Sequence, residues 1–184
     1  MLFIIASYLL GTILIAAVVA KIKGVKLHEQ NSGNLGARNA GRTLGKSAFV
    51  IVAIGDGLKG VAIVVAGRVL ELPELTIAVA IIAVVLGHLY PFWNSGKGGK
   101  GVATVIGAML AFSPLIFLSF LAGFLICLGI TKSATLSMGG GFIVYGIVTG
   151  IYTEVGFIVS IALLLVIWKQ RHSIIERVKP NVLE

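Results

Sequence analysis

Charged side chains are scarce in this sequence. Asp, Glu, Lys and Arg make up 12% of its 184 residues, whereas a typical soluble domain has about 25%. Hydrophobic residues account for 58% of the chain, and its mean hydropathy is +1.05. These values exclude an ordinary soluble globular domain. They predict a single membrane domain over residues 1–184.

Cysteine and histidine are also rare. The single cysteine, Cys127, excludes an internal disulfide. The three histidines, His28, His88 and His172, have no carboxylate or cysteine at ligand spacing, so we expect neither a metal site nor a cofactor. A Gly-x-Ser-x-Gly segment is missing as well, which disfavours a serine nucleophile. Any chemistry must then depend on positioning and on neutralising negative charge.

The apolar residues form long runs. A helix needs about 20 apolar residues to cross a bilayer, with about 17–25 as the usual range. The sequence therefore predicts an all-α integral membrane protein with about seven transmembrane helices, near residues 2–20, 49–67, 75–92, 101–113, 115–130, 136–151 and 154–168. Several runs are short, so the fourth and the seventh can instead be re-entrant or half-buried in the bundle.

Acidic residues are outnumbered by basic ones, and the positions of the basic residues predict a topology. With the N-terminus outside, all of the 15 Lys and Arg residues except Lys59 and Arg68 fall on the inner face, where basic residues collect. The C-terminal tail 169–184 is then cytoplasmic. Because these charges flank membrane spans, they indicate contact with lipid headgroups and not with nucleic acid.

Two glycine-rich segments, residues 28–46 and 87–104, lie on this inner face. Glycine lets backbone N–H groups approach an anion closely, arginine offers a planar fork of donors, and lysine supplies a point charge. Either segment alone can be a flexible turn, but together they predict a phosphate site facing the cytoplasm. Its candidate residues are Ser32, Gly33, Asn34, Asn39, Arg42, Lys97, Gly98, Gly99, Lys100, Gly101 and Thr104.

The second segment is not a nucleotide-binding P-loop. Lys100 precedes Gly101, which reverses the P-loop order, and a His-Leu-Tyr-Pro break stands where a strand should lead into the loop.

Asp56 and Lys59 are charged residues inside the second predicted span. Their spacing of three residues places them on one side of a helix turn. Charges within a membrane are expensive and are usually paired or directed at a polar cavity. Two interpretations follow: a structural ion pair, or a pair that lines the phosphate site, with Lys59 as a binding residue.

Three stretches resemble one known family. SGNLGARNAGRTLGK, GDGLKG and GHLYPFWNSGKGGKGVAT, in this order, are similar to the acyl-phosphate-dependent glycerol-3-phosphate acyltransferases of bacteria, the PlsY family. That family transfers a fatty acyl group from acyl phosphate to the 1-hydroxyl of glycerol 3-phosphate, giving lysophosphatidic acid and phosphate. The resemblance implies an enzyme of phospholipid biosynthesis in the bacterial plasma membrane, with its active site facing the cytoplasm. Its expected partners are the two substrates, the lipid bilayer and the upstream enzyme that produces acyl phosphate.

The resemblance also implies roles for individual residues of the two glycine-rich segments. Ser32 and Arg42 hold the glycerol phosphate, whereas Lys97 and Lys100 bind phosphate oxygens. The charge that develops on oxygen is met by backbone amides of three glycines, Gly98, Gly99 and Gly101.

Other roles stay open at this point. Asn34 and Asn39 either shape the loop or bind hydroxyl groups. His88 is either the general base, for which histidine is well suited near neutral pH, or a structural hydrogen-bonding residue. In the second case, the transferred phosphate itself takes the proton.

The segment Arg171–Val178 departs from the family pattern His-x-x-Asn-Ile-x-Arg-Leu. Arg171 replaces the histidine and Ile174 the asparagine, whereas Arg177 is kept and His172 can partly compensate. Arg177 and His172 are therefore candidate binding residues.

The altered segment leaves open a relative that acylates another phosphorylated acceptor. A second alternative, an organic-phosphate transporter, follows from a basic chain with seven spans and with Asp56 and Lys59 inside one of them. The transporter is disfavoured because the halves show no repeat and the polar residues gather on one face.

We predict a raised Michaelis constant for glycerol 3-phosphate because Ile174 removes a polar contact. One hydrogen bond is worth about 0.5–1.5 kcal/mol, or up to about 3 kcal/mol if a partner is charged. Ile174→Asn should partly restore acceptor affinity in steady-state kinetics, and His172→Ala should be harmful only if that histidine has taken over the contact. A fully active parent whose affinity Ile174→Asn leaves unchanged or lowers would show that the segment is aligned wrongly.

Overall fold

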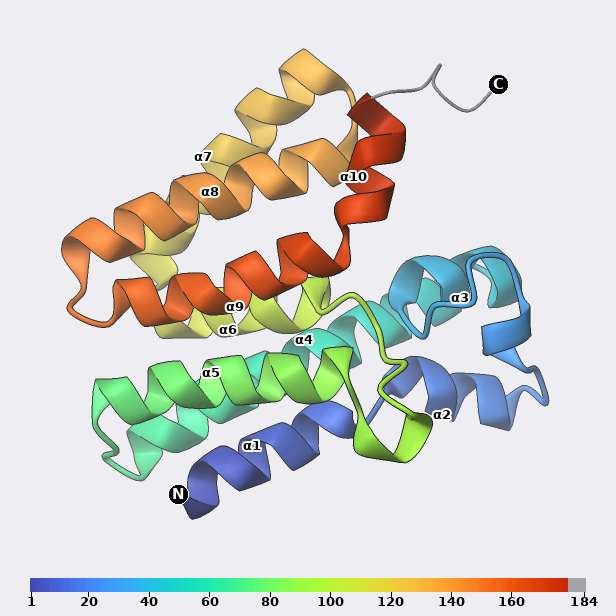
Figure 1. Ribbon diagram of the computed structural model, residues 1–184, viewed down its shortest axis with the longest axis horizontal. Coiled ribbons are helices and arrows are strands. Elements are labelled where there is room, and N and C mark those ends of the chain that lie inside the picture. The colour runs from blue at the N-terminus through green and yellow to red at the C-terminus, as the bar shows by residue number, and fades with distance from the viewer. Residues whose placement is uncertain (179–184) are drawn as a thin grey trace. The chain divides into compact units, whose positions relative to one another are not determined.

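The computed structural model describes residues 1–178, and within them the chain forms α-helices and two short 3-10 turns, with no strand (Figure 1). The all-α prediction is confirmed for this part of the chain. The chain divides into two compact units, Met1–Phe112 and Ser113–Glu184, here called the N-terminal and C-terminal units. The prediction for the tail 169–184 extends past the described residues, because Lys179 and the residues after it lie outside them.

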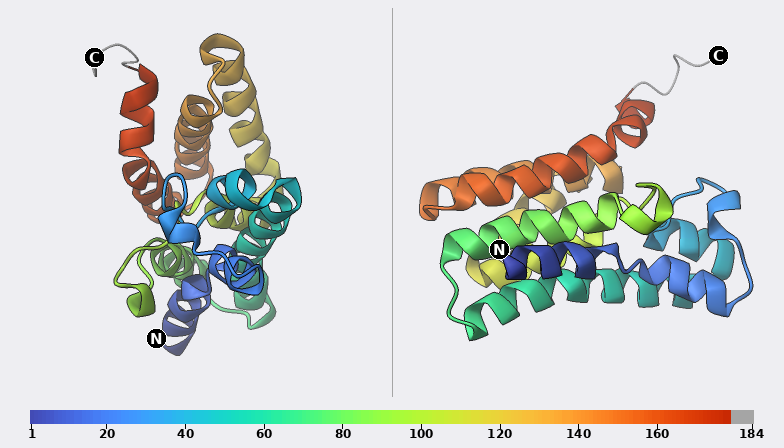
Figure 2. Two further views of the ribbon diagram at one scale, coloured as in Figure 1. Left: turned by 90° about the vertical axis from the view of Figure 1, so that its right-hand side faces the viewer. Right: turned by 60° about the horizontal axis from the view of Figure 1, so that its bottom comes forward.

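The N-terminal unit is built around two helix pairs, α1 on α5 and α4 on α6. Its first apolar run is a broken helix, because the backbone is extended at Ile13 and Leu14. The two halves follow each other along the unit (Figure 2, right). The helices of this unit are α1 (Leu2–Thr12), α2 (Ile15–Ile22), α3 (Ala37–Leu44), α4 (Lys46–Val69), α5 (Glu74–Leu89) and α6 (Val102–Phe112), with 3-10 turns at Leu27–Glu29 and Phe92–Asn94.

Glycines allow these helices to pack backbone to backbone. A Cβ atom on Gly11 in α1 would overlap the carbonyl of Val84 in α5. In the other pair, a Cβ on Gly107 in α6 would overlap the carbonyl of Gly57 in α4. Small residues at such crossings are typical of helices that associate in lipid, where close van der Waals packing replaces the hydrophobic driving force.

The C-terminal unit contains α7 (Pro114–Thr131), α8 (Ala134–Tyr152), α9 (Gly156–Lys169) and α10 (Arg171–Val178). Ser113 caps α7 by accepting a hydrogen bond from the Ile116 N–H at 3.4 Å, directly before a proline at the first helical position. Between α7 and α8, the rings of Phe120 and Phe142 stack with centroids 5.5 Å apart. A bend of 61° separates α9 from α10.

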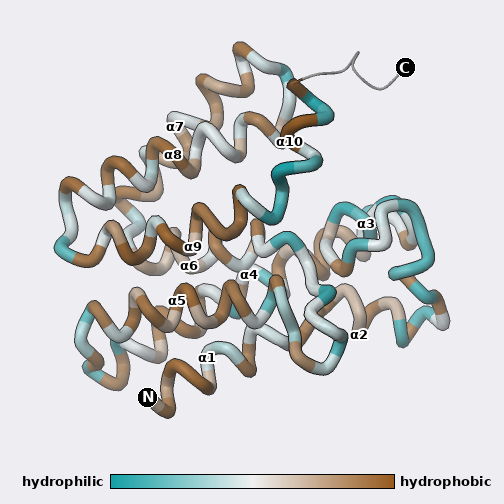
Figure 3. Tube along the Cα trace, viewed as in Figure 1, coloured by the Kyte–Doolittle hydropathy of each residue, from teal (hydrophilic) through white to brown (hydrophobic). Residues whose placement is uncertain are grey.

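Each of the seven predicted spans coincides with a helix or a broken helix. Among the described residues, five segments are long and apolar enough to cross a membrane, and the bent pair α9–α10 makes a sixth. The remaining one, α6, has only 11 residues. Hydropathy along the trace separates apolar helices from the hydrophilic regions around α3 and α10 (Figure 3). The number of crossings and the orientation stay predictions.

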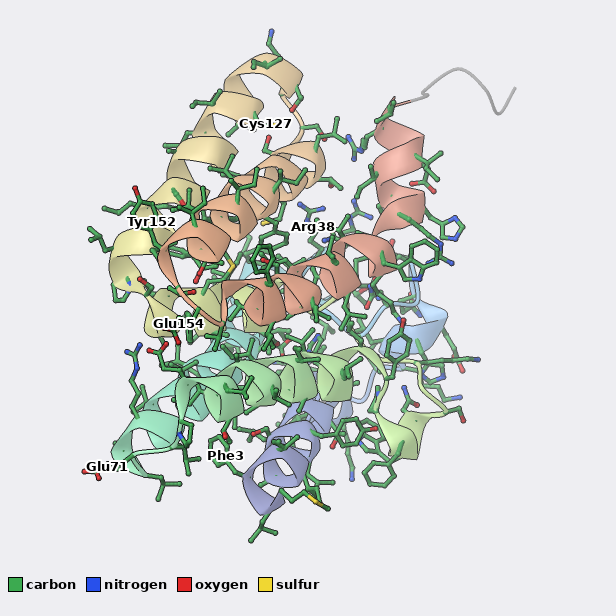
Figure 4. The ribbon with its side chains drawn as sticks, turned by 60° about the vertical axis from the view of Figure 1, so that its left-hand side comes forward. Phe3, Arg38, Glu71, Cys127, Tyr152 and Glu154 are labelled. Carbon is green, nitrogen blue, oxygen red and sulfur yellow. The ribbon has the colours of Figure 1, made fainter. Side chains whose placement is uncertain are left out.

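The two ends of the N-terminal unit differ in charge. The turn between α4 and α5 contains Glu71, whose side chain points away from the helices (Figure 4). The opposite end contains α3 and the segment after α5, where the predicted phosphate residues lie (Figure 1). The orientation that places the second end on the inner face stays a prediction.

Gly107→Ala should destabilise the protein by about 1–3 kcal/mol, because the added methyl group overpacks the α4–α6 crossing. Gly129→Ala is the matched control: it also lies within a helix, but a Cβ there has nothing within 4 Å. Thermal unfolding in one detergent should separate the two variants. Equal melting temperatures would contradict the close crossing.

Candidate active site

The first glycine-rich segment is held in shape by Asn39. This buried side chain donates to the Leu27 carbonyl at 3.1 Å and accepts from the Ser32 N–H at 3.4 Å. It thereby connects the segment before α3 to the helix itself. Of the two roles open for Asn39, the geometry therefore supports shaping the loop.

Among the exposed side chains of this segment are those of Ser32 and Arg42. Arg42 lies in the last turn of α3. Gly33 has a φ of +66°, a conformation that favours glycine. Asn34 is half-buried, and among the described residues its Oδ1 atom has no hydrogen-bond partner. It is therefore free to accept a hydrogen bond.

The second segment folds back onto the end of α5. The Gly99 N–H donates to the His88 carbonyl at 3.0 Å, and the Gly98 N–H donates to the Leu89 carbonyl at 3.2 Å. These two amides are therefore already used within the loop. The expectation that they meet charge on a substrate oxygen is corrected accordingly.

Gly101 keeps a positive φ of +76° where the chain turns into α6. The first backbone N–H groups of α6 have no carbonyl one turn before them within the helix. Beside them, the hydroxyl of Thr104 is fully buried and has no hydrogen-bond partner among the described residues. A helix start of this kind favours an anion.

Gly99 is the point where the two segments meet. A Cβ atom there would overlap Nε2 of His88 and would lie 2.9 Å from the Leu35 carbonyl of the first segment. The glycine therefore lies between the imidazole and the other loop. Close contact here brings the segment with Arg42 next to the one with Lys97 and Lys100. In their own segment, Lys97 is exposed and Lys100 is half-buried.

Below this junction, Asp56 and Lys59 form an ion pair with Nζ–Oδ1 3.0 Å, and the exposed fraction of each side chain is 5% or less. The Lys59 ammonium also donates to the carbonyls of Gly11 at 3.3 Å and Ile13 at 2.8 Å, and it lies 3.0 Å from Nδ1 of His88. The three N–H groups of the Lys59 ammonium are thus surrounded by four acceptors: two carbonyls, the carboxylate and the imidazole. Lys59 has no donor left for a substrate, so of the two interpretations left open for this pair the geometry favours the structural one.

Sequence reasoning missed several residues that organise this end of the unit. Trp93 donates from its indole to the Thr12 carbonyl at 2.9 Å, and Tyr8 donates to the Tyr90 carbonyl at the same distance. Both join the first span to the segment after α5. The sequence shows a tryptophan next to a glycine-rich loop, but nothing in it identifies the acceptor.

His172 and Arg177 belong to the C-terminal unit, where both are exposed on α10. Ile174 is half-buried and lines an apolar pocket of about 500 Å³ between α9 and α10, together with Leu164 and Trp168. Arg171 borders the same pocket, and its guanidinium lies 4.7 Å from the Trp168 ring centroid. Ile174 therefore extends an apolar surface at this bend. Its correspondence to the asparagine of the family pattern stays a prediction.

The chain matches known proteins over nearly its full length. The family model described as "Glycerol-3-phosphate acyltransferase" matches residues 1–179. The glycerol-3-phosphate acyltransferase of Bacillus subtilis is 37% identical in an alignment of 195 positions, gaps included, that covers 98% of this chain and 96% of the relative. Glycerol-3-phosphate acyltransferase 1 of Bacillus cereus is 39% identical in an alignment of 142 positions that covers 74% of this chain and 78% of the relative.

A solved structure agrees with the fold. The crystal structure of PlsY (YgiH), an integral membrane glycerol 3-phosphate acyltransferase in its glycerol 3-phosphate form, has a TM-score of 0.87 and 32% sequence identity. The match covers 97% of this chain and 92% of that one. A second crystal structure, the lysophosphatidic acid form, has a TM-score of 0.85. The prediction of an integral membrane protein is thereby confirmed.

Gly99→Ala should weaken binding of inorganic phosphate by about tenfold or more, equivalent to about 1.4 kcal/mol, because the methyl group separates the two loops at the His88 ring. Gly36→Ala is the matched control, since its Cβ would meet only Asn34 Oδ1 at 3.7 Å, an ordinary contact. The shift of melting temperature with phosphate concentration measures both affinities. Equal affinities would show that the junction does not shape the anion site.

Proposed function

The chain belongs to the glycerol-3-phosphate acyltransferase family, and we propose that it transfers a fatty acyl group from acyl phosphate to the 1-hydroxyl of glycerol 3-phosphate. As a member of this family it is a membrane acyltransferase of phospholipid synthesis. The products are lysophosphatidic acid and inorganic phosphate. The names of its relatives support glycerol 3-phosphate as the acceptor, whereas the acyl donor is proposed from the site.

The observation that supports this reaction best is the junction of two basic, glycine-rich loops at Gly99. Acceptor and donor each bring a phosphate, so the reaction needs two anion-binding surfaces next to each other. The fatty acyl group also needs apolar surroundings. Apolar helices adjoin the loops directly, because α5 ends at Leu89 and α6 begins at Val102.

In this assignment each loop binds the phosphate of one substrate. Ser32 and Arg42 hold the phosphate of glycerol 3-phosphate, and Asn34 offers an acceptor for a hydroxyl group. Lys97 and Lys100 bind the phosphate of the donor, supported by the buried start of α6 at Thr104. Arginine suits the first role because its planar fork matches phosphate oxygens.

The chemical step is a direct attack. The 1-hydroxyl oxygen forms a bond to the acyl carbonyl carbon, and the bond from that carbon to the phosphate oxygen breaks. Acyl phosphate is a mixed anhydride and therefore already activated, so no acyl-enzyme is required. Negative charge develops on oxygen, and the cations of Arg42 and Lys100 stabilise it.

The proton of the attacking hydroxyl goes to the departing phosphate. Nδ1 of His88 already lies 3.0 Å from the Lys59 ammonium, and the Nε2 side of the ring contacts Gly99. This geometry favours the structural role for His88 over that of general base.

The orientation belongs to the same proposal. With the N-terminus outside and seven crossings, both loops face the cytoplasm of a bacterial cell at its plasma membrane. An upstream enzyme that produces acyl phosphate then delivers a donor to this face. His172 and Arg177 on α10 are proposed to bind the acceptor, with the contact normally made by asparagine replaced by the apolar Ile174.

The decisive experiment supplies the purified full chain with acyl phosphate and radiolabelled glycerol 3-phosphate and looks for labelled lysophosphatidic acid. Acyl coenzyme A and acyl carrier protein serve as alternative donors. Product formed from acyl phosphate alone supports the proposal. Product formed only from another donor, or none from any of the three, would overturn the donor assignment.

Arg42→Ala and Lys100→Ala should each lower kcat/KM by about 10²-fold, which is typical for losing a charge that stabilises the transition state. Both proteins should still extract and run as monodisperse species, because Arg42 is exposed and Lys100 half-buried. Lys21→Ala, an exposed lysine at the end of α2, is the control and should stay fully active. Loss of folding together with activity in both variants would indicate a structural role instead.

A further inference from the structure

The Asp56–Lys59 pair lies at the break between α1 and α2. The Lys59 ammonium donates to carbonyls of Gly11 and Ile13, at the C-terminal end of α1. The Asp56 carboxylate faces the backbone N–H of Ile15, in the first turn of α2. Because carbonyl ends of helices attract cations and amide ends attract anions, each charge matches the helix end that it faces.

This arrangement explains how two charges are tolerated inside an apolar helix. The extended residues Ile13 and Leu14 interrupt the helical hydrogen bonds of the first span. In lipid, each unpaired backbone group costs several kcal/mol. Lys59 satisfies two of the exposed carbonyls, and Trp93 satisfies a third, that of Thr12. The ion pair therefore stabilises a broken span as well as its own two charges.

The contact between Lys59 and His88 bears on which nitrogen of the imidazole carries the proton. An ammonium group has only donors, so Nδ1, 3.0 Å from Lys59, must accept a hydrogen bond. In the neutral ring the proton is then on Nε2, the atom next to Gly99. Asp56 lies farther from Nδ1, at 3.7 Å, and would favour the opposite tautomer if Lys59 were absent.

We propose that Lys59 is a positioning residue, whose ammonium holds His88 as the Nε2–H tautomer. The imidazole ring is thereby fixed in the position in which it contacts Gly99 and supports the Lys97–Gly101 loop. The effect on catalysis depends on the proposed acyltransferase function. The effect on the tautomer does not. Lys59 never touches substrate, because its donors are directed at the two carbonyls, the carboxylate and the imidazole.

The tautomer can be measured directly by ¹⁵N NMR on the substrate-free full chain, labelled at histidine. A His88→Gln protein identifies the His88 signals among those of the three histidines. Wild-type His88 should show one unprotonated nitrogen, Nδ1, and one protonated nitrogen, Nε2. A proton on Nδ1 in the wild type would overturn the proposal without any variant of Lys59.

Two variants then separate Lys59 from Asp56. Lys59→Met removes the donor, and His88 should change to a mixture of tautomers or to Nδ1–H directed at Asp56. Asp56→Asn keeps the ammonium and an acceptor oxygen for it, so the Nε2–H tautomer should persist. An unchanged tautomer in a folded Lys59→Met protein would contradict the role of Lys59. If that variant does not fold, the wild-type and Asp56→Asn spectra still decide.

Kinetics test the link to the loop. Lys59→Met should lower kcat by about 10²-fold, the scale expected when a catalytic group moves by about 1 Å. The Michaelis constant for glycerol 3-phosphate should change less than twofold, because Arg42 and Ser32 stay in place. Lys21→Met, far from His88 in the sequence and exposed, is the control and should keep its activity. A changed tautomer with unchanged kcat would overturn the positioning role.

Failure of the two proposals can be told apart. If the wild type forms no labelled lysophosphatidic acid but His88 has the Nε2–H tautomer, the reaction is wrong and the arrangement of Lys59 is right. If product forms and the proton is on Nδ1, the reaction stands and the role of Lys59 falls.

Discussion

A lysine ammonium buried at a helix break is the constraint on which the N-terminal unit depends. A buried cation is tolerated only when it is paired and hydrogen-bonded, and Lys59 has both a carboxylate partner and carbonyl acceptors. These acceptors exist only because the first span is interrupted at Ile13 and Leu14. The break therefore depends on the charge and the charge on the break, and the contact with His88 connects both to the two glycine-rich loops.

Glycine allows close approach of neighbouring groups in two places, the helix crossings and the loop. In the helices, Gly11 and Gly107 let backbones approach so closely that no side chain fits between them. In the loop, Gly99 does the same between an imidazole and the Leu35 carbonyl. A membrane protein with short helices has little other means to fix a site, because lipid offers no hydrophobic driving force for helix association. Tight crossings therefore substitute for a large core.

The helices were predictable because their apolar runs are long and separated by basic or glycine-rich segments. The break in the first span was not, since Ile13 and Leu14 continue an apolar run without proline or glycine. It is stabilised by donors 46 and 81 residues away, Lys59 and Trp93. Such contacts depend on tertiary packing, which periodicity does not reveal. For the same reason, the sequence left both roles of Lys59 open.

The location of the candidate site was easier to predict from composition than its hydrogen bonds were. Basic residues among glycines indicated phosphate, and the structure brings their two segments together at Gly99. The amides of Gly98 and Gly99, however, are used by carbonyls of α5. The backbone of this loop is therefore fixed, and the anion binding that we propose for the site depends on the side chains of Lys97, Lys100 and Arg42 and on the start of α6. A loop whose backbone is already hydrogen-bonded loses little backbone entropy when it binds a ligand, which lowers the cost of the phosphate binding that we propose for it.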